Sequence, residues 1–156
     1  MAKSAKPRKP YRPKYAPGYM LLPQQRDAIV MPVHTAMAAF EMGGGSLHLR
    51  HTLAAFLNIV GVCAAKMVGT ATETREAIDA AKHALVSSDR RYLKTSRFGF
   101  SGEEIQAIRL AITLGDELIK RANSSVLTYA VAFVSQCNAR TPEVLGMVHE
   151  PLGEAP

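Results

Sequence analysis

Two groups of side chains have the residue types and spacing that a metal site would need. His48 and His51 stand three residues apart, so a helix would place both imidazoles on one face. Glu76, Asp79 and His83 follow at steps of three and four and would also share a helical face. No Cys, Asp or Glu beside the histidine pair completes a coordination sphere, and the chain lacks the two Glu-x-x-His pairs of a carboxylate-bridged metal centre. We therefore predict solvated helix surfaces and no metal site.

The neighbouring carboxylates are the remaining candidates for chemistry. Asp116 and Glu117, like Glu103 and Glu104, are adjacent, so each pair splays by about 100° on a helix and cannot act together as acid and base. The sequence contains no G-x-S-x-G elbow, no phosphate-binding G-x-x-x-x-G-K-[ST] loop and no C-x-x-C pair. We predict that the protein is not an enzyme and uses no cofactor.

The elements that carry these residues read as helices. Apolar residues recur at steps of three and four, nothing alternates with a period of two, and short polar or glycine-rich stretches separate the periodic segments. These features predict an all-α fold, an up-and-down bundle of four main helices within residues 20–140. The segments run from Pro23 to the glycines at 43–45, from about Leu47 to Val68, from about Thr70 to Lys94, and from Ser101 to Cys137.

The boundaries of these helices follow from local signals. Pro23 suits a first turn, Pro32 should kink or split the first helix, and Thr70–Glu73 and Ser101–Glu104 each have capping-box spacing. The last helix either breaks or bends at Asn123–Ser125; if continuous, it would reach thirty-seven residues and overhang its partners. Gly115 and Ala122 would let a neighbouring helix approach closely, and the apolar surroundings of Cys63 and Cys137 predict two buried thiols.

Positive charge is concentrated at the N-terminus. Residues 1–26 hold seven Lys and Arg and no acid, whereas the remaining 130 residues carry twelve bases and thirteen acids. Prolines at 7, 10, 13 and 17 exclude a helix there. We predict a disordered basic arm over residues 1–19 and a flexible acidic tail over residues 141–156.

The arm suggests contact with nucleic acid, because each neutralised phosphate releases condensed counterions. Tyr11, Tyr15 and Tyr19 could stack on bases between the cations. The alternatives are that the arm is a solubilising terminus and that a second group of cations, near the end of the third helix, compensates the helix dipole. The predicted nucleic-acid contacts are Lys6, Arg8, Lys9, Arg12 and Lys14 in the arm, and Arg90, Arg91, Lys94 and Arg97 near the end of the third helix.

A second hypothesis is binding to a protein. The apolar overhang at residues 126–137 must pack on the first helix, on a second subunit in a homodimer, or on a partner, with Tyr129 and Phe133 as the partner-binding residues. The apolar run Thr52–Ala65 is about fourteen residues long, which is short for a membrane span. No signal peptide precedes the domain, so we expect a cytoplasmic protein that does not contact the membrane.

Several stretches of the chain resemble known proteins of one kind. The runs KPYRPK, MLLPQQRD, LRHTLAAFLNIV and GFSGEEIQAIRLAITLGDELIKR together span most of residues 6–122. They resemble small uncharacterised all-α proteins of proteobacterial prophages and mobile elements. The resemblance implies an accessory role in a bacterial host: contact with nucleic acid, or binding that disables or adapts a host protein.

Overall fold

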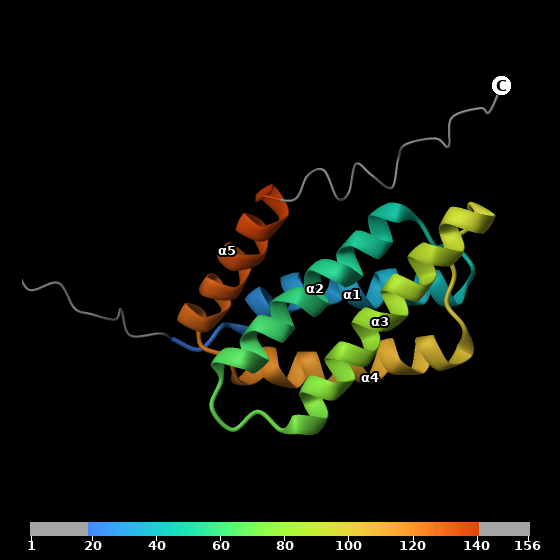
Figure 1. Ribbon diagram of the computed structural model, residues 1–156. Helices are drawn as coiled ribbons and strands as arrows, with labels where there is room; N and C mark the ends of the chain where they lie inside the picture. The colour runs from blue at the N-terminus through green and yellow to red at the C-terminus, as the bar shows by residue number, and fades with distance from the viewer. Residues whose placement is uncertain (1–18, 141–156) are drawn as a thin grey trace, which may run out of the picture.

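The computed structural model describes residues 19–140, and these residues form five helices with short connections (Figure 1). The prediction of an all-α fold is confirmed, whereas the count of four main helices is not. Within residues 19–140 the only β-type pairing is a single antiparallel bridge between Met20 and Asn123. The predicted tail and all of the predicted arm except Tyr19 lie outside the described residues. The helices are α1 (Pro23–Glu41), α2 (Leu47–Lys66), α3 (Thr72–Thr95), α4 (Gly102–Arg121) and α5 (Ser124–Arg140).

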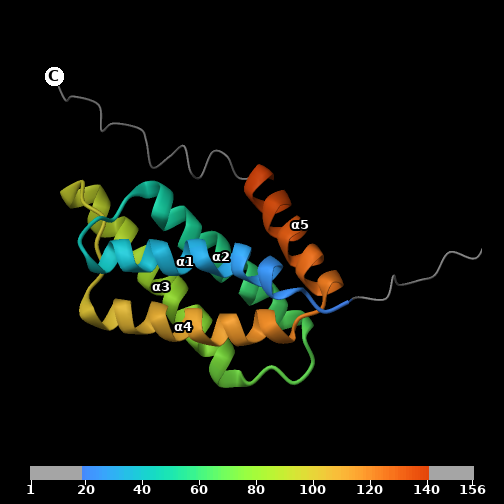
Figure 2. The same ribbon diagram turned by 180° about the vertical axis from the view of Figure 1, so that it is seen from behind.

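The first four helices form two crossed layers. α2 and α3 run obliquely across α1 and α4, which lie behind them in Figure 1 and in front of them in the reverse view (Figure 2). α2 is the central helix, since it packs on each of the other four helices, whereas the main contact of α5 is with α2. The face of α2 that α1 and α4 do not cover therefore lies between α3 and α5.

The core explains the central position of α2. Leu53, Phe56 and Val60 are almost completely buried on its inner face. Gly115 of α4 allows the close approach predicted for it, because an added Cβ would lie 2.9 Å from the ring of Phe56 and 3.1 Å from Val60. α2 is also long and apolar enough to cross a membrane, although a third of the relevant window is buried inside the protein.

The predicted thirty-seven-residue helix is broken into α4 and α5. α4 ends at Arg121, Ala122 adopts an extended conformation, and the Asn123 side-chain oxygen accepts a hydrogen bond from the Val126 amide at 3.0 Å. The Asn side chain thus supplies the acceptor that caps a new helix N-terminus. Tyr19 pairs with the start of α5, because the Ser124 amide donates to its carbonyl at 2.8 Å.

Other helix boundaries were predicted with mixed success. The Ser101–Glu104 capping box is present, and Pro23 starts α1 as expected. The capping box predicted at Thr70–Glu73 is wrong, because the Thr70 hydroxyl donates to the Met67 carbonyl and α3 begins at Thr72. Pro32 does not split α1, since a single proline removes one backbone donor. The helix stays packed because Ile29 and Val30 before Pro32 are partly buried against the core and four residues after it, from Val33 to Phe40, are buried.

The cysteines also differ from one another. Cys63 is buried, as predicted, whereas Cys137 is exposed. The prediction for Cys137 is wrong because α5 turns away from the line of α4, and among residues 124–138 only Leu127, Ala130 and Val134 are buried.

Candidate binding surfaces

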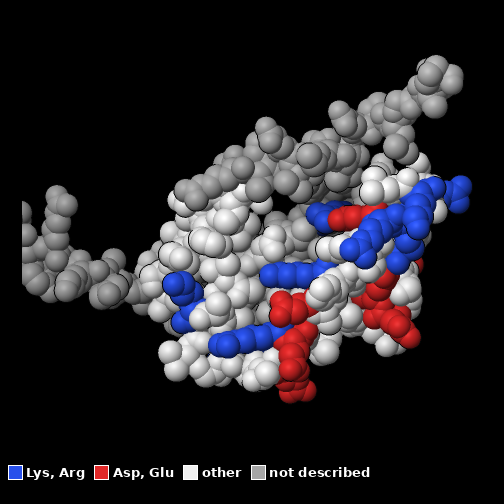
Figure 3. All heavy atoms as spheres, in the orientation of Figure 1, with Lys and Arg blue, Asp and Glu red and all other residues white. Residues whose placement is uncertain are grey.

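The C-terminal end of α3 carries the first candidate surface. Ser96 adopts a left-handed conformation, with φ of 55°, and ends the helix after Thr95. Arg97 therefore does not continue the helical face of Arg90 and Lys94, as the sequence pattern required. All three side chains are nevertheless exposed, and cations gather over this end of α3 at the right of Figure 3.

Arg91, predicted as a phosphate contact, has partners within the protein. Its guanidinium donates to Glu104 of α4, with 2.9 Å between Nη1 and Oε1, and to the Gly99 carbonyl at 2.9 Å. The hydrogen bond from Arg91 lowers the pKa of Glu104, and the same pair raises the pKa of Arg91. The buried Ser88 hydroxyl also donates to the Gly99 carbonyl, at 3.0 Å. Arg91 therefore holds the α3–α4 connection against both helices.

The aromatic residues beside this surface also pack internally. Phe98 stacks on Tyr92 with 3.9 Å between ring centroids, and Phe100 lies 4.5 Å from Phe40 of α1. These contacts bring the α3–α4 connection next to the C-terminal end of α1.

Most other cations of the described residues have a partner. Ion pairs join Arg50 to Asp89, Arg109 to Glu41, and Lys120 to Glu117. Arg26 and Arg75 donate to backbone carbonyls, and Lys66 lies 4.7 Å from the centre of the Tyr129 ring. Among residues 19–138, the cationic side chains without an ion pair, side-chain hydrogen bond or ring contact are Lys82, Arg90, Lys94, Arg97 and Arg121.

The second candidate surface includes the two predicted partner-binding residues on α5. Tyr129 is 46% exposed and Phe133 45% exposed, with 6.1 Å between their ring centroids. Each ring lies one helical turn from the other, so they form a continuous aromatic strip. α5 contains no Lys, Arg, Asp or Glu before Arg140.

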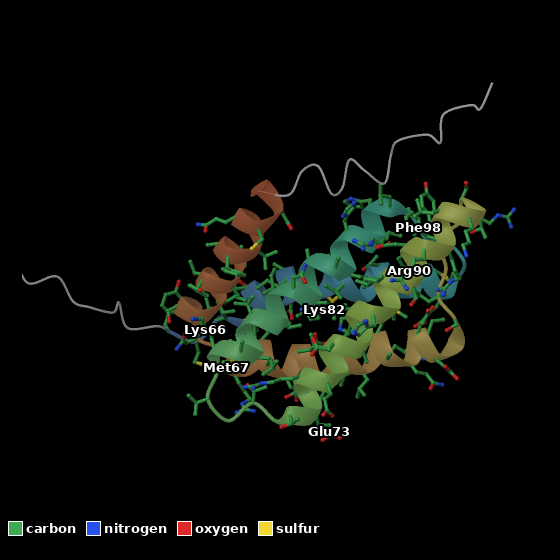
Figure 4. All side chains as sticks on the ribbon, viewed as in Figure 1. Lys66, Met67, Glu73, Lys82, Arg90 and Phe98 are labelled. Carbon is green, nitrogen blue, oxygen red and sulfur yellow. The ribbon has the colours of Figure 1, made fainter. Side chains whose placement is uncertain are left out.

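A groove runs beside this strip, with α2 as its floor; we call it the α2 groove. It consists of two adjoining hollows of about 370 Å³ and about 180 Å³, which share Gly61, Ala65 and Lys82. Phe133 and Val134 of α5 line the larger hollow. The side chain of Lys82 extends from α3 toward α2 (Figure 4), and a Cβ added at Gly61 would lie 2.9 Å from the Lys82 ammonium. A residue with no side chain at position 61 leaves room for that ammonium.

Two of the residues considered for metal binding or catalysis belong to these surfaces, because Asp79 lines the smaller hollow of the α2 groove and Glu104 binds Arg91. Glu76, Asp79 and His83 are exposed, as predicted for a solvated face. Burial and the adjacent Arg50 lower the pKa of His51. Within residues 19–140, no three His, Cys, Asp or Glu side chains come together to form a metal-binding group.

One polar pair was missed at the sequence level. His34 of α1 donates through Nε2 to Asp116 Oδ2 of α4 at 2.8 Å. The two residues are 82 positions apart, so no local spacing signalled the contact. A His–Asp pair can orient a general base. In the hollow that His34 lines, however, the only hydroxyl is that of Thr113, which already donates to the Arg109 carbonyl.

The chain matches no family model, no curated protein and no solved structure. Its function is therefore inferred from the two surfaces.

Proposed function

We propose that this protein is a non-enzymatic accessory protein that contacts nucleic acid. The contacts are the basic arm and the exposed cations Arg90, Lys94 and Arg97. The observation that carries the proposal is a contrast among the cations of residues 19–138. Most of the others have a partner within the fold, whereas these three are exposed together at one end of α3.

The electrostatics favour a ligand with regularly spaced negative charge. Three exposed cations, together with the Lys and Arg of the arm, match a phosphate backbone, which carries one charge at every step and needs no particular base sequence. Phe98 and Phe100 each pack on a ring of the protein, so the proposed contact of that connection is made by its cations. The proposed binding is therefore independent of sequence.

The attachment point of the arm and the exposed cations at one end of α3 lie at opposite ends of the described residues. The arm joins the described chain at Tyr19, beside the start of α5, whereas Arg97 lies near the C-terminal end of α1. The nineteen residues of α1 correspond to about 28 Å. A duplex rises about 3.4 Å per base pair, so a duplex lying from the attachment point of the arm to Arg97 would span about eight base pairs.

The test is a salt series of binding to a fluorescent duplex of random sequence. The full chain, a chain that begins at Tyr19, and the triple variant Arg90→Gln, Lys94→Gln, Arg97→Gln are compared. Each lost phosphate contact should reduce the slope of log affinity against log salt by about 0.9, so the triple variant should lose about 2.7.

A matched control removes equal charge elsewhere. The triple variant Arg109→Gln, Lys120→Gln, Arg121→Gln takes the same formal charge from α4, and its slope should stay close to that of the full chain. Equal losses in both triple variants would mean that only net charge matters. Binding that does not depend on salt would refute the proposal.

The exposed aromatic strip favours a second candidate function, an inhibitor or adaptor that binds a host protein. Tyr129 and Phe133 are large aromatic side chains next to a groove, the kind of surface on which partner proteins anchor. Its test is capture of a bacterial protein that survives high salt and is lost on Phe133→Asp. Val131→Asp is the control, because Val131 is similarly exposed, at 43%, and does not line the groove.

A further inference from the structure

The α2 groove is not explained by contact with nucleic acid. Its floor is formed by Gly61, Val62 and Ala65. Phe133 and Val134 of α5 give it an apolar wall, whereas the α3 wall combines Ile78 with charged side chains. Lys82 lies partly buried across the middle, without an ion pair among the described residues. An apolar groove with an unpaired ammonium at its centre suits an apolar segment that carries a carboxylate.

A segment with that chemistry follows α5 directly. Cys137 and Asn138 line the groove, and α5 ends at Arg140, so residues 141–156 are joined to the chain two residues beyond the lining of the groove. Sixteen residues follow Arg140 and can span up to about 50 Å. The groove floor from Asn58 to Ala65 is about 10 Å long. Length therefore does not limit access.

The composition of residues 141–156 complements the groove. The segment contains three Glu and no Lys or Arg, and Val144, Leu145 and Val148 follow its first carboxylate. The charged groups that line the groove are Arg75, Lys82 and Asp79, a net positive charge. Arg75 lines only the smaller hollow and donates to the Ala64 carbonyl, whereas Lys82 lines both hollows and has no ion pair among the described residues. Lys82 is therefore the cation placed to meet a carboxylate along the groove.

We propose that residues 141–156 bind in the α2 groove of the same chain, with a carboxylate of the segment paired to Lys82. By itself the sequence favours a flexible tail; the groove adds an apolar surface and a cation within reach of it. Direct attachment to α5 gives the segment an effective concentration on the order of millimolar, so even weak affinity suffices. This inference is independent of the proposed contact with nucleic acid.

The two cysteines provide a measurement of groove occupancy. Cys63 is buried, and burial raises the pKa of its thiol to about 11, so it should not react in the folded protein. Cys137 is exposed and lines the groove. The rate at which a maleimide labels Cys137 therefore reports whether the groove is covered, and labelling of one thiol per chain confirms that Cys63 is silent.

The decisive variant is Lys82→Glu in the full chain. Loss of the ion pair should release the segment and make labelling of Cys137 about two- to fivefold faster, the range for a partly exposed pair. If the segment does not dock, Lys82→Glu should instead slow the labelling of Cys137, because a new carboxylate beside a thiol disfavours the reactive thiolate. In a chain that ends at Arg140, Lys82→Glu should give no acceleration.

Two further measurements complete the test. Lys94→Glu, which makes the same charge change at the far end of α3, should leave the rate unchanged. The peptide of residues 141–156, added at millimolar concentration, should slow labelling of the chain that ends at Arg140. Slower or unchanged labelling of Lys82→Glu would overturn the proposal, as would protection that rises with protein concentration, which would assign the groove to a second copy.

Discussion

Arg90 and Arg91 are neighbours with the same charge, yet the structure gives them different roles. Arg90 is exposed and has no internal partner among the described residues, whereas Arg91 is bound to Glu104 and to the Gly99 carbonyl. Replacing each in turn with Gln therefore separates binding from stability. The two variants change the same charge at adjacent positions and serve as controls for each other.

The expected magnitudes follow from these contacts. Arg91→Gln removes a bidentate ion pair and a hydrogen bond to a carbonyl, but its side chain is 43% exposed, so solvent screening limits the loss to about 1–2 kcal/mol. For a domain of this size, that lowers Tm by about 2–6 °C. Arg90→Gln should change the free energy of unfolding by less than about 0.5 kcal/mol and reduce the salt slope of duplex binding by about 0.9.

Two assays decide between the roles. Thermal unfolding followed by circular dichroism gives the loss of stability, and fluorescence anisotropy of a labelled duplex across a salt series gives the slope. If Arg91→Gln reduced the slope as much as Arg90→Gln did and left Tm unchanged, the assignment of Arg91 to the α3–α4 connection would be wrong.

Three further predictions concern pH, packing and α5. The lowered pKa of Glu104 contributes stability that is present above its ordinary pKa of 4.5 and is lost as the pH falls through the lowered pKa. In urea denaturation, Glu104→Gln should therefore be less stable than the parent at neutral pH and equally stable in acid. A difference in stability that stayed constant across this pH range would contradict the prediction. Gly115→Val should cost about 1–3 kcal/mol by overpacking, whereas Gly102→Ala, which meets nothing within 4 Å, should be neutral in the same assay; equal costs would refute the close approach of α2 and α4. Ala130→Asp places a charge at a fully buried position and should detach α5 or cost more than about 3 kcal/mol, whereas Val131→Asp should cost less than about 0.5 kcal/mol. Hydrogen exchange of the α5 amides measures the effect and should be faster in Ala130→Asp than in Val131→Asp. Faster exchange in Val131→Asp would contradict the prediction.

Local signals predicted the helices better than they predicted the connection between α4 and α5. Ser101 and Glu104 lie within one turn of each other, so their capping box depends on nothing distant, and it is present. At Asn123 the sequence allowed either a bend or a break. The choice depended on a hydrogen bond from the Val126 amide and on pairing with Tyr19, a residue more than one hundred positions away.

The candidate surfaces also combine features that the sequence could predict with features that depend on contacts between helices. The sequence predicted Arg90, Lys94 and Arg97 as a cluster of cations and Tyr129 and Phe133 as partner-binding residues. The structure shows that all five side chains are exposed, and each group stays together because neighbours in sequence stay neighbours on or near one helix. It could not distinguish Arg91 from Arg90, since the partner of Arg91 lies on another helix. The His34–Asp116 pair and the α2 groove were also beyond it, because each is formed by residues from different helices.

The sequence by itself determined that this protein is helical, where most of its helices begin and end, and that its positive charge is concentrated in the arm. Propensity, capping and composition act within a few residues, so they can be read along the chain. Only the tertiary structure decided that α5 folds back onto α2, which cations remain exposed, and that Lys82 lies across a groove. These features depend on which helices pack together, and packing is set by contacts between residues far apart in the sequence.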